Sequence, residues 1–303
     1  MREPIETYFQ MGTIQWMSYP GEPVLESLRK ILCDDFFSAV EVCQAADDDT
    51  RKAMRDMLAQ SHVKVCYGAQ PRLLGPGLNP NDIVEENRLK AEKTLLEAID
   101  EAEYLGAKGI AFLAGKWKEE TKEEAYSQLL KTTRNLCAYA ATKKMNVELE
   151  VFDFDIAKKS LIGPAKFAGR FAGEIRERYG NFGLLVDLSH IPMCYEKAGY
   201  TVRTLREYIT HFHIGNTVIG SPTDEGYGDE HQRFGFPGGS NDVEAVLDFL
   251  RVLQREGFFK EEEPYVLSFE VKPWKEEDPD TVVANAKRVL TRAWAMLEEG
   301  EDK

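Results

Sequence analysis

The sequence lacks a long apolar run and any cysteine pair in a metal-type or redox-type spacing. No stretch approaches the roughly 18 to 20 apolar residues that cross a bilayer, and the start MREPIETYFQ lacks the basic and apolar regions of a signal peptide. The five cysteines are odd in number and form no CxxC motif, which favours a reducing compartment. We therefore expect a cytoplasmic protein without a membrane partner.

Positive charge is also scarce. Lys and Arg total 38 against 52 Asp and Glu, which leaves a net charge of -14. Such a field repels phosphate backbones and anionic lipid, so we expect no nucleic-acid partner and a small-molecule substrate instead. The apolar content of 43% is enough to bury a large core, and no linker or shift in composition divides the chain. The sequence predicts a single domain over residues 1–303.

Strand-like and helix-like patterns alternate along the whole chain. Apolar, β-branched and aromatic runs predict eight strands at residues 12–19, 39–44, 63–70, 109–115, 146–152, 183–187, 211–215 and 265–272. Helical spacing lies between them, including a helix over 81–106 capped by Asn81 or Asp82 and a final helix capped by Asp278. Eight βα steps predict a closed (β/α)8 TIM barrel. An open doubly wound sheet is the weaker alternative, because no GxGxxG follows the first strand.

Histidine is concentrated in one part of the chain. Four of the five histidines lie between residues 183 and 239, namely His190, His211, His213 and His231. With Asp187 and Asp229 they offer the mixed nitrogen and oxygen ligands that zinc, manganese or cobalt accepts. A histidine near a strand is more often a packed, hydrogen-bonded residue, so each position has that alternative. We expect His211 to face away from His213 and to pack against a helix.

The last four predicted strands each end in a side chain that can bind a metal. These residues are Glu150, Asp187, His213 and Glu270. Because the carboxyl ends of barrel strands converge at one mouth, the four side chains are expected to meet there. Glu148 competes with Glu150 for the position on the fifth strand, and Glu150 is preferred because it lies nearer the strand end.

At these residues the sequence resembles the xylose isomerase-like, or AP endonuclease-like, superfamily of (β/α)8 barrels. The resemblance implies that Glu150, Asp187, His213 and Glu270 hold one divalent ion (Mn²⁺, Co²⁺, Mg²⁺ or Zn²⁺), as in the ketose 3-epimerase members. His190 matches a substrate-binding residue of those enzymes, and Arg233 resembles their substrate-binding arginine. His231 is assigned to the substrate as well. A homo-oligomer is expected by analogy with the relatives.

The resemblance also implies a reaction. A divalent ion that binds a carbonyl and its neighbouring hydroxyl favours enolisation, and Glu150 and Glu270 are assigned as the acid and base. The expected function is a metal-dependent sugar isomerase or epimerase that removes a proton next to the carbonyl of a ketose or oxo-sugar. Trp16 is a candidate apolar wall against the ring of this carbohydrate, with core packing as the alternative.

Three other functions stay open. The long loops at 153–164 and 217–239 favour a metal-dependent lyase or dehydratase acting on a 3-oxo-glycoside or inosose. An AP endonuclease-like hydrolase would use a second metal at His190, Asp229 and His231, but the third and fourth strands end in CYGAQ and FLAG, without the histidines that such nucleases use for a further zinc ion. A non-catalytic sugar-binding protein would need the metal site to be absent or inert.

Overall fold

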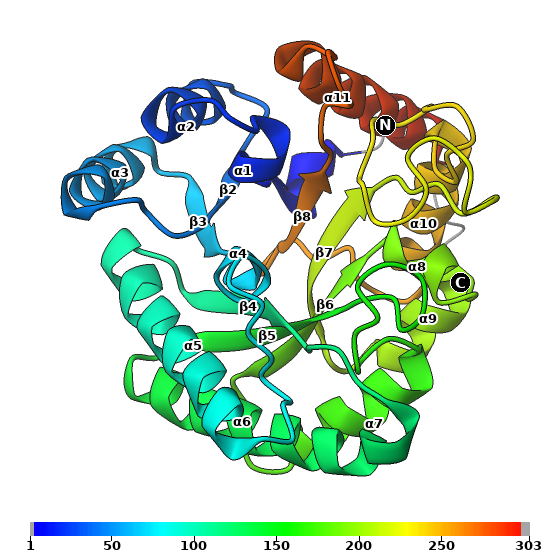
Figure 1. Cartoon of the computed structure of the whole chain (residues 1–303). Helices are drawn as coiled ribbons and strands as arrows, with labels where there is room; N and C mark the ends of the chain where they lie inside the picture. The colour runs from blue at the N-terminus through cyan, green and yellow to red at the C-terminus, as the bar shows by residue number, and fades with distance from the viewer. Residues whose placement is uncertain (1–2, 298–303) are drawn as a thin grey trace.

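The computed structural model, which describes residues 3–297, has eight strands arranged in a ring with helices outside (Figure 1). The strands are β1 (Phe9–Thr13), β2 (Ala39–Val42), β3 (Lys64–Tyr67), β4 (Gly109–Leu113), β5 (Asn146–Val151), β6 (Phe182–Asp187), β7 (Ile209–Gly215) and β8 (Tyr265–Glu270).

The strands pair in parallel as a six-stranded sheet, ordered β1-β8-β7-β6-β5-β4, and a two-stranded sheet, β2-β3. Single parallel bridges join the two sheets, between Ile14 and Glu41 on one side and between Gly68 and Ala111 on the other. These bridges close the ring, and the predicted (β/α)8 barrel is confirmed.

Helices follow the strands around the ring, and some are shorter than the sequence pattern predicted. The helical segments are η1 (Ile5–Thr7), α1 (Gln15–Ser18), α2 (Val24–Leu32), α3 (Asp48–Ser61), α4 (Gln70–Leu74), α5 (Glu85–Leu105), η2 (Glu119–Thr121), α6 (Lys122–Thr142), α7 (Ala165–Arg176), α8 (His190–Met193), α9 (Ala198–Leu205), α10 (Val243–Arg255) and α11 (Pro279–Met296). The short helices α1, α4 and α8 come directly after β1, β3 and β6, so they lie at the carboxyl end of the barrel.

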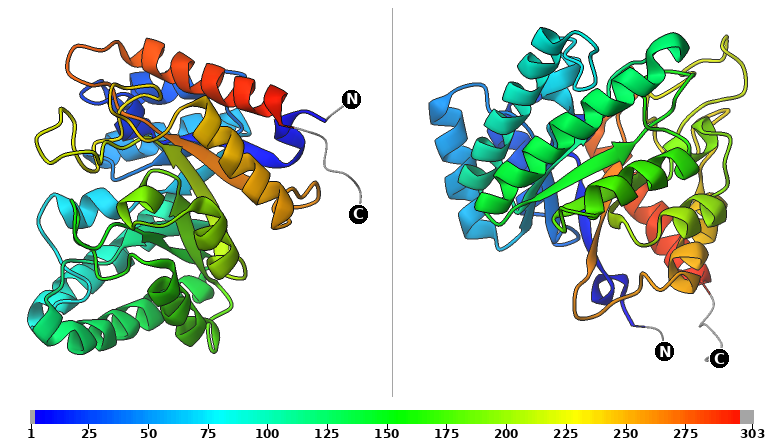
Figure 2. Two further views of the ribbon diagram at one scale, coloured as in Figure 1. Left: turned by 90° about the vertical axis from the view of Figure 1, so that its right-hand side faces the viewer. Right: turned by 90° about the horizontal axis from the view of Figure 1, so that it is seen from below.

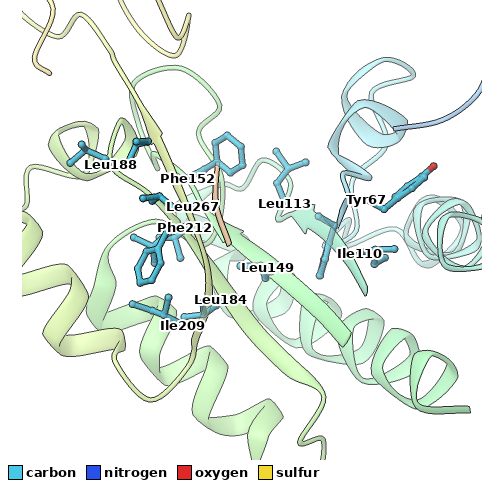
Figure 3. Close-up of a cluster of buried hydrophobic side chains, with 14 of the residues drawn as sticks. Tyr67, Ile110, Leu113, Leu149, Phe152, Leu184, Leu188, Ile209, Phe212 and Leu267 are labelled. Atoms are coloured by element: carbon cyan, nitrogen blue, oxygen red, sulfur yellow. The ribbon is translucent and has the colours of Figure 1, made fainter. Parts of the chain in front are cut away.

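The strands separate a polar interior from an apolar exterior. Successive strand residues point to opposite faces, so Leu149 and Phe212 face outward between their polar neighbours. Both side chains are fully buried in the apolar layer beneath the helices, together with Leu184, Ile209 and Leu267 (Figure 3). Burying each such side chain contributes about 1.5–3 kcal/mol, so this outer layer stabilises the barrel while its interior remains free for polar groups.

The expectation for His211 was wrong. Residues two apart on a strand share a face, so His211 lies inside the barrel beside His213, with the two ring centres 5.0 Å apart. Its Nδ1 is 3.2 Å from Glu148 Oε2, and its Nε2 is 3.1 Å from Glu41 Oε1. His211 is therefore part of a buried polar layer beneath the strand ends.

Two element boundaries also differ from the sequence pattern. The aromatic run at 12–19 is not one strand: β1 ends at Thr13, and Trp16 lies in α1. Trp16 packs so closely on Gly68 that a Cβ there would lie 2.3 Å from Trp16 Cη2, so the long-range packing of this residue differs from the strand preference of the run.

Helix α5 begins at Glu85, and neither Asn81 nor Asp82 caps it. The Asn81 side chain accepts from the Gly115 amide at 2.6 Å and donates to the Lys116 carbonyl at 2.9 Å instead. By contrast, the Asp278 cap of α11 is confirmed, because its side chain accepts from the Thr281 amide at 2.8 Å.

Two long loops extend from the carboxyl end of the barrel. The loop after β7, residues 216–242, projects at the opposite end from η1 (Figure 2). The loop after β5 is organised by Asp153, as described below. No helix within residues 3–297 has the length and apolar character to cross a membrane, and all five cysteines are free.

Candidate active site

Three predicted ligands meet inside the mouth of the barrel. Glu150, His213 and Glu270 each offer one ligand atom, and these atoms lie within 4.8 Å of one another. His213 Nδ1 is 2.7 Å from Glu270 Oε2 and 3.6 Å from Glu150 Oε1. All three side chains are buried.

One oxygen of this group has no hydrogen-bond partner among residues 3–297. Glu150 Oε2 accepts from Gln70 Nε2 at 2.8 Å, but the buried Glu150 Oε1 accepts no hydrogen bond from this part of the chain. A buried carboxylate oxygen without a partner is costly unless a cation satisfies it, and oxygen and imidazole nitrogen are ligands of divalent metals. These residues therefore fit a divalent ion.

Glu41 contacts the second ring nitrogen of His213, Nε2. Its Oε1 lies 2.9 Å from His213 Nε2, which leaves Nδ1 directed toward Glu150 and Glu270. A carboxylate behind a ligating histidine sets the orientation of the ring and raises its basicity. Burial acts to lower the pKa of His213, but the carboxylates of Glu41 and Glu270 outweigh it and raise that pKa well above its ordinary value.

Sequence reasoning missed both Glu41 and Gln70. The only available signal for Glu41 was an ionisable residue in the middle of the apolar strand AVEV. No local pattern pointed to Gln70, which reaches Glu150 from α4 after β3.

Asp187, the fourth predicted ligand, belongs to a neighbouring group with His190 and His231. Its Oδ2 lies 3.6 Å from His190 Nε2 and 3.8 Å from His231 Nδ1, and its Oδ1 accepts from the Ser189 amide at 2.9 Å. The two groups touch, because His231 Nε2 is 3.4 Å from Glu270 Oε1. The four predicted ligands are thus close together but divided between two adjacent groups.

Asp229 links the two histidines of the second group. Its Oδ1 is 3.0 Å from His190 Nε2 and 2.7 Å from His231 Nε2, and its Oδ2 is 2.6 Å from Lys158 Nζ. Burial acts to raise the pKa of Asp229, but His231 and His190 hold it well below its ordinary value. Burial acts to lower the pKa of His190, but Asp187 and Asp229 outweigh it and raise that pKa to about 10.

A cavity of about 280 Å³ opens above these groups. Its apolar wall consists of Ile14, Trp16, Met17, Pro71, Leu74 and Phe152. Its polar wall consists of Gln70, Glu150, Lys158, Asp229, Glu230, His231, Glu270 and Lys272. One side of the cavity suits an apolar surface of a ligand, and the other suits hydroxyl and carbonyl groups.

Two of the four predicted substrate-binding residues line the cavity, and the other two do not. Trp16 and His231 line the cavity. His190 lies deeper, with its Nδ1 3.1 Å from the Val151 carbonyl oxygen. Arg233 is not among the lining residues; its Nε donates to Glu277 Oε1 at 2.8 Å, so its guanidinium is directed toward an ion pair outside the cavity wall.

The fold and these side chains together define a parallel (β/α)8 barrel with a candidate metal centre at the carboxyl ends of its strands. The chain belongs to the xylose isomerase-like TIM barrel family, which matches residues 36–290. A search of curated proteins finds no match.

Solved structures share the whole barrel at low sequence identity. A D-tagatose 3-epimerase-like protein has a TM-score of 0.73 and 17% identity over 95% of this chain and 99% of its own. The IOLI protein with a binding zinc atom has a TM-score of 0.73 and 15% identity over 96% of this chain and 100% of its own. The 3-keto-D-glucoside 4-epimerase YcjR from E. coli has a TM-score of 0.68 and 17% identity over 93% of this chain and 99% of its own. At these identities the similarity shows the fold alone.

Proposed function

We propose that this protein is a divalent-metal-dependent sugar isomerase or epimerase that moves a proton on the carbon next to a carbonyl. The observation that carries the proposal is the pair of buried carboxylates, Glu150 and Glu270, which face one cavity and converge on His213. The similar structures of a 3-keto-D-glucoside 4-epimerase and of a D-tagatose 3-epimerase-like protein support this proposal.

Glu150, Asp187, His213 and Glu270 would hold one divalent ion, with Mn²⁺, Co²⁺, Mg²⁺ and Zn²⁺ all compatible with the donor set. When bound, the ion supplies Lewis-acid polarisation of a substrate carbonyl and its neighbouring hydroxyl. The protein's part is to orient the ligands: Gln70 fixes one oxygen of Glu150, and Glu41 fixes the ring of His213.

The same two carboxylates would carry the proton. Burial and the neighbouring Glu150 raise the pKa of Glu270, although His231 and His213 oppose them. A carboxyl with a raised pKa can accept and return a proton near neutral pH. Trp16 and Phe152, on the apolar wall, would cover one face of the sugar ring and exclude water from the exchanging carbon.

The test uses Glu270→Gln and Glu150→Gln in deuterated water, with a panel of ketoses, oxo-glycosides and inososes. We expect the native protein to bind a divalent ion and to exchange a substrate proton for deuterium without the loss of any group from the substrate. Each variant is expected to lose turnover. Glu148→Gln is the matched control, because this carboxylate lies on the same strand but contacts His211 and Thr210 rather than the cavity. If Glu270→Gln keeps its metal and full turnover, the assignment is wrong.

A metal-dependent lyase is the second candidate. Lys158 and His231, from the two long loops, line the same cavity as Glu150 and Glu270, so further proton donors are available for a departing group. A lyase would form an unsaturated product or release an aglycone, whereas an epimerase conserves mass. An AP endonuclease-like hydrolase is disfavoured, since β3 is followed by Gly68-Ala69 and β4 by Ala114-Gly115, without histidine.

A further inference from the structure

Lys158 places a positive charge directly against the second group of ligand-type side chains. Its ammonium is 2.6 Å from Asp229 Oδ2, while the other oxygen of Asp229 faces His190 and His231. The Asp229 side chain is only 2% exposed. A carboxylate at that depth needs charged or hydrogen-bonding partners, and Lys158 contacts Asp229 in addition to His190 and His231.

Hydrogen bonds within the loop after β5 fix the position of Lys158. The fully buried Asp153 accepts four backbone N–H groups of that loop, from Ile156 and Ala157 at 2.7 Å, Lys158 at 2.8 Å and Lys159 at 3.4 Å. Ser160 continues the anchoring, since its hydroxyl donates to the Ala114 carbonyl at 3.0 Å. Lys158 is therefore directed into the cavity, whereas the neighbouring Lys159 is exposed to solvent.

The second group would otherwise suit a metal. Asp187, His190 and His231 offer ligand atoms within 4.8 Å of one another, and Asp229 lies between the two histidines. Asp187 is also assigned to the first ion above, so its carboxylate would be shared between the two sites. A divalent ion there would be repelled by the adjacent ammonium and would have to compete with it for Asp229. An ammonium donates hydrogen bonds but cannot ligate or polarise in the way that a metal does.

We propose that Lys158 takes the place of a second metal ion: its ammonium neutralises Asp229 and prevents His190, Asp229 and His231 from holding a divalent cation. The protein then binds one divalent ion, at Glu150, His213 and Glu270, although it has most of the ligand side chains for a second ion. This inference rests on the proposed function only for the presence of the first ion. The exclusion of a second ion by Lys158 is independent of it.

The experiment counts metal ions in the folded full-length protein after dialysis against Zn²⁺ and, separately, Mn²⁺. Lys158→Met removes the charge at similar side-chain length, and Lys158→Arg keeps the charge. Lys159→Met is the matched control, because it removes an exposed positive charge from the next residue. We expect one ion per chain in the native protein, in Lys158→Arg and in Lys159→Met, and two ions in Lys158→Met. The added ion should be lost again in Lys158→Met/Asp229→Asn.

Two ions in the native protein, or no added ion in folded Lys158→Met, would overturn the inference. If Lys158→Met does not fold, Lys158→Gln, which also removes the charge, takes its place and is expected to bind two ions. No ion in the native protein but one in Lys158→Met would contradict the proposed function and leave the role of Lys158 standing. No ion in any variant would overturn both.

Discussion

Replacing Glu41 with Gln is expected to weaken divalent-ion binding without unfolding the barrel. Glu41 lies on β2, is 1% exposed, and places Oε1 at 2.9 Å from His213 Nε2 and 3.1 Å from His211 Nε2. Glutamine has nearly the same shape and keeps an oxygen that can accept from His213. The substitution therefore removes the charge behind the ligand while the packing is retained.

The size of the effect follows from two opposing contributions. The Glu41 carboxylate favours a cation at the far side of the His213 ring, but it also favours a proton on that ring, as the raised pKa of His213 indicates. Only the difference between these two contributions changes the metal affinity. Outer carboxylate partners of ligating histidines typically contribute about 10- to 100-fold in affinity, or roughly 1.4 to 2.7 kcal/mol.

The assay is a competition titration between the protein and a chelator of known affinity, at one pH and one temperature. The native protein, Glu41→Gln and Glu148→Gln are compared, since Glu148 lies 3.2 Å from His211, whereas the carboxylates paired with His213 among residues 3–297 are Glu41, Glu150 and Glu270. We expect a large loss of affinity in Glu41→Gln and a much smaller one in Glu148→Gln. Equal affinities in a folded Glu41→Gln and the native protein would refute the role given to Glu41.

Two further predictions concern pH and stability. Because carboxylates raise the pKa of His213, ion binding must displace the proton on its ring. The apparent dissociation constant of the ion should therefore rise as pH falls, by up to about tenfold per pH unit for each proton displaced. Metal titrations at several pH values check this, and a dissociation constant that does not change with pH would contradict it. Asp278→Ala removes the cap that accepts from the Thr281 amide and should lower the free energy of unfolding by roughly 1 kcal/mol. Urea unfolding measures this change, with Glu276→Ala, an exposed carboxylate before the cap, as the comparison.

The spacing of apolar residues along the chain was sufficient to predict the barrel and the approximate ends of most of its strands. Period-two alternation and βα spacing depend only on local sequence, and Glu150, Asp187, His213 and Glu270 were predicted as ligands because each lies at or within two residues of the carboxyl end of a strand. The same local reasoning failed at Trp16, because the aromatic run favours a strand locally whereas in the structure β1 ends at Thr13 and the run continues in α1.

The sequence by itself determined the ring of eight strands, the polar strand ends and the kind of ligand atoms they carry, because each depends on residue type and short-range spacing. Only the tertiary structure decided which of these atoms share a site. Asp187 joins His190 and His231, Arg233 pairs with Glu277, and Lys158 reaches Asp229 across two loops. The physical reason is that side-chain partners within a few ångströms are selected by burial and charge among residues far apart in sequence, and no local pattern encodes that choice.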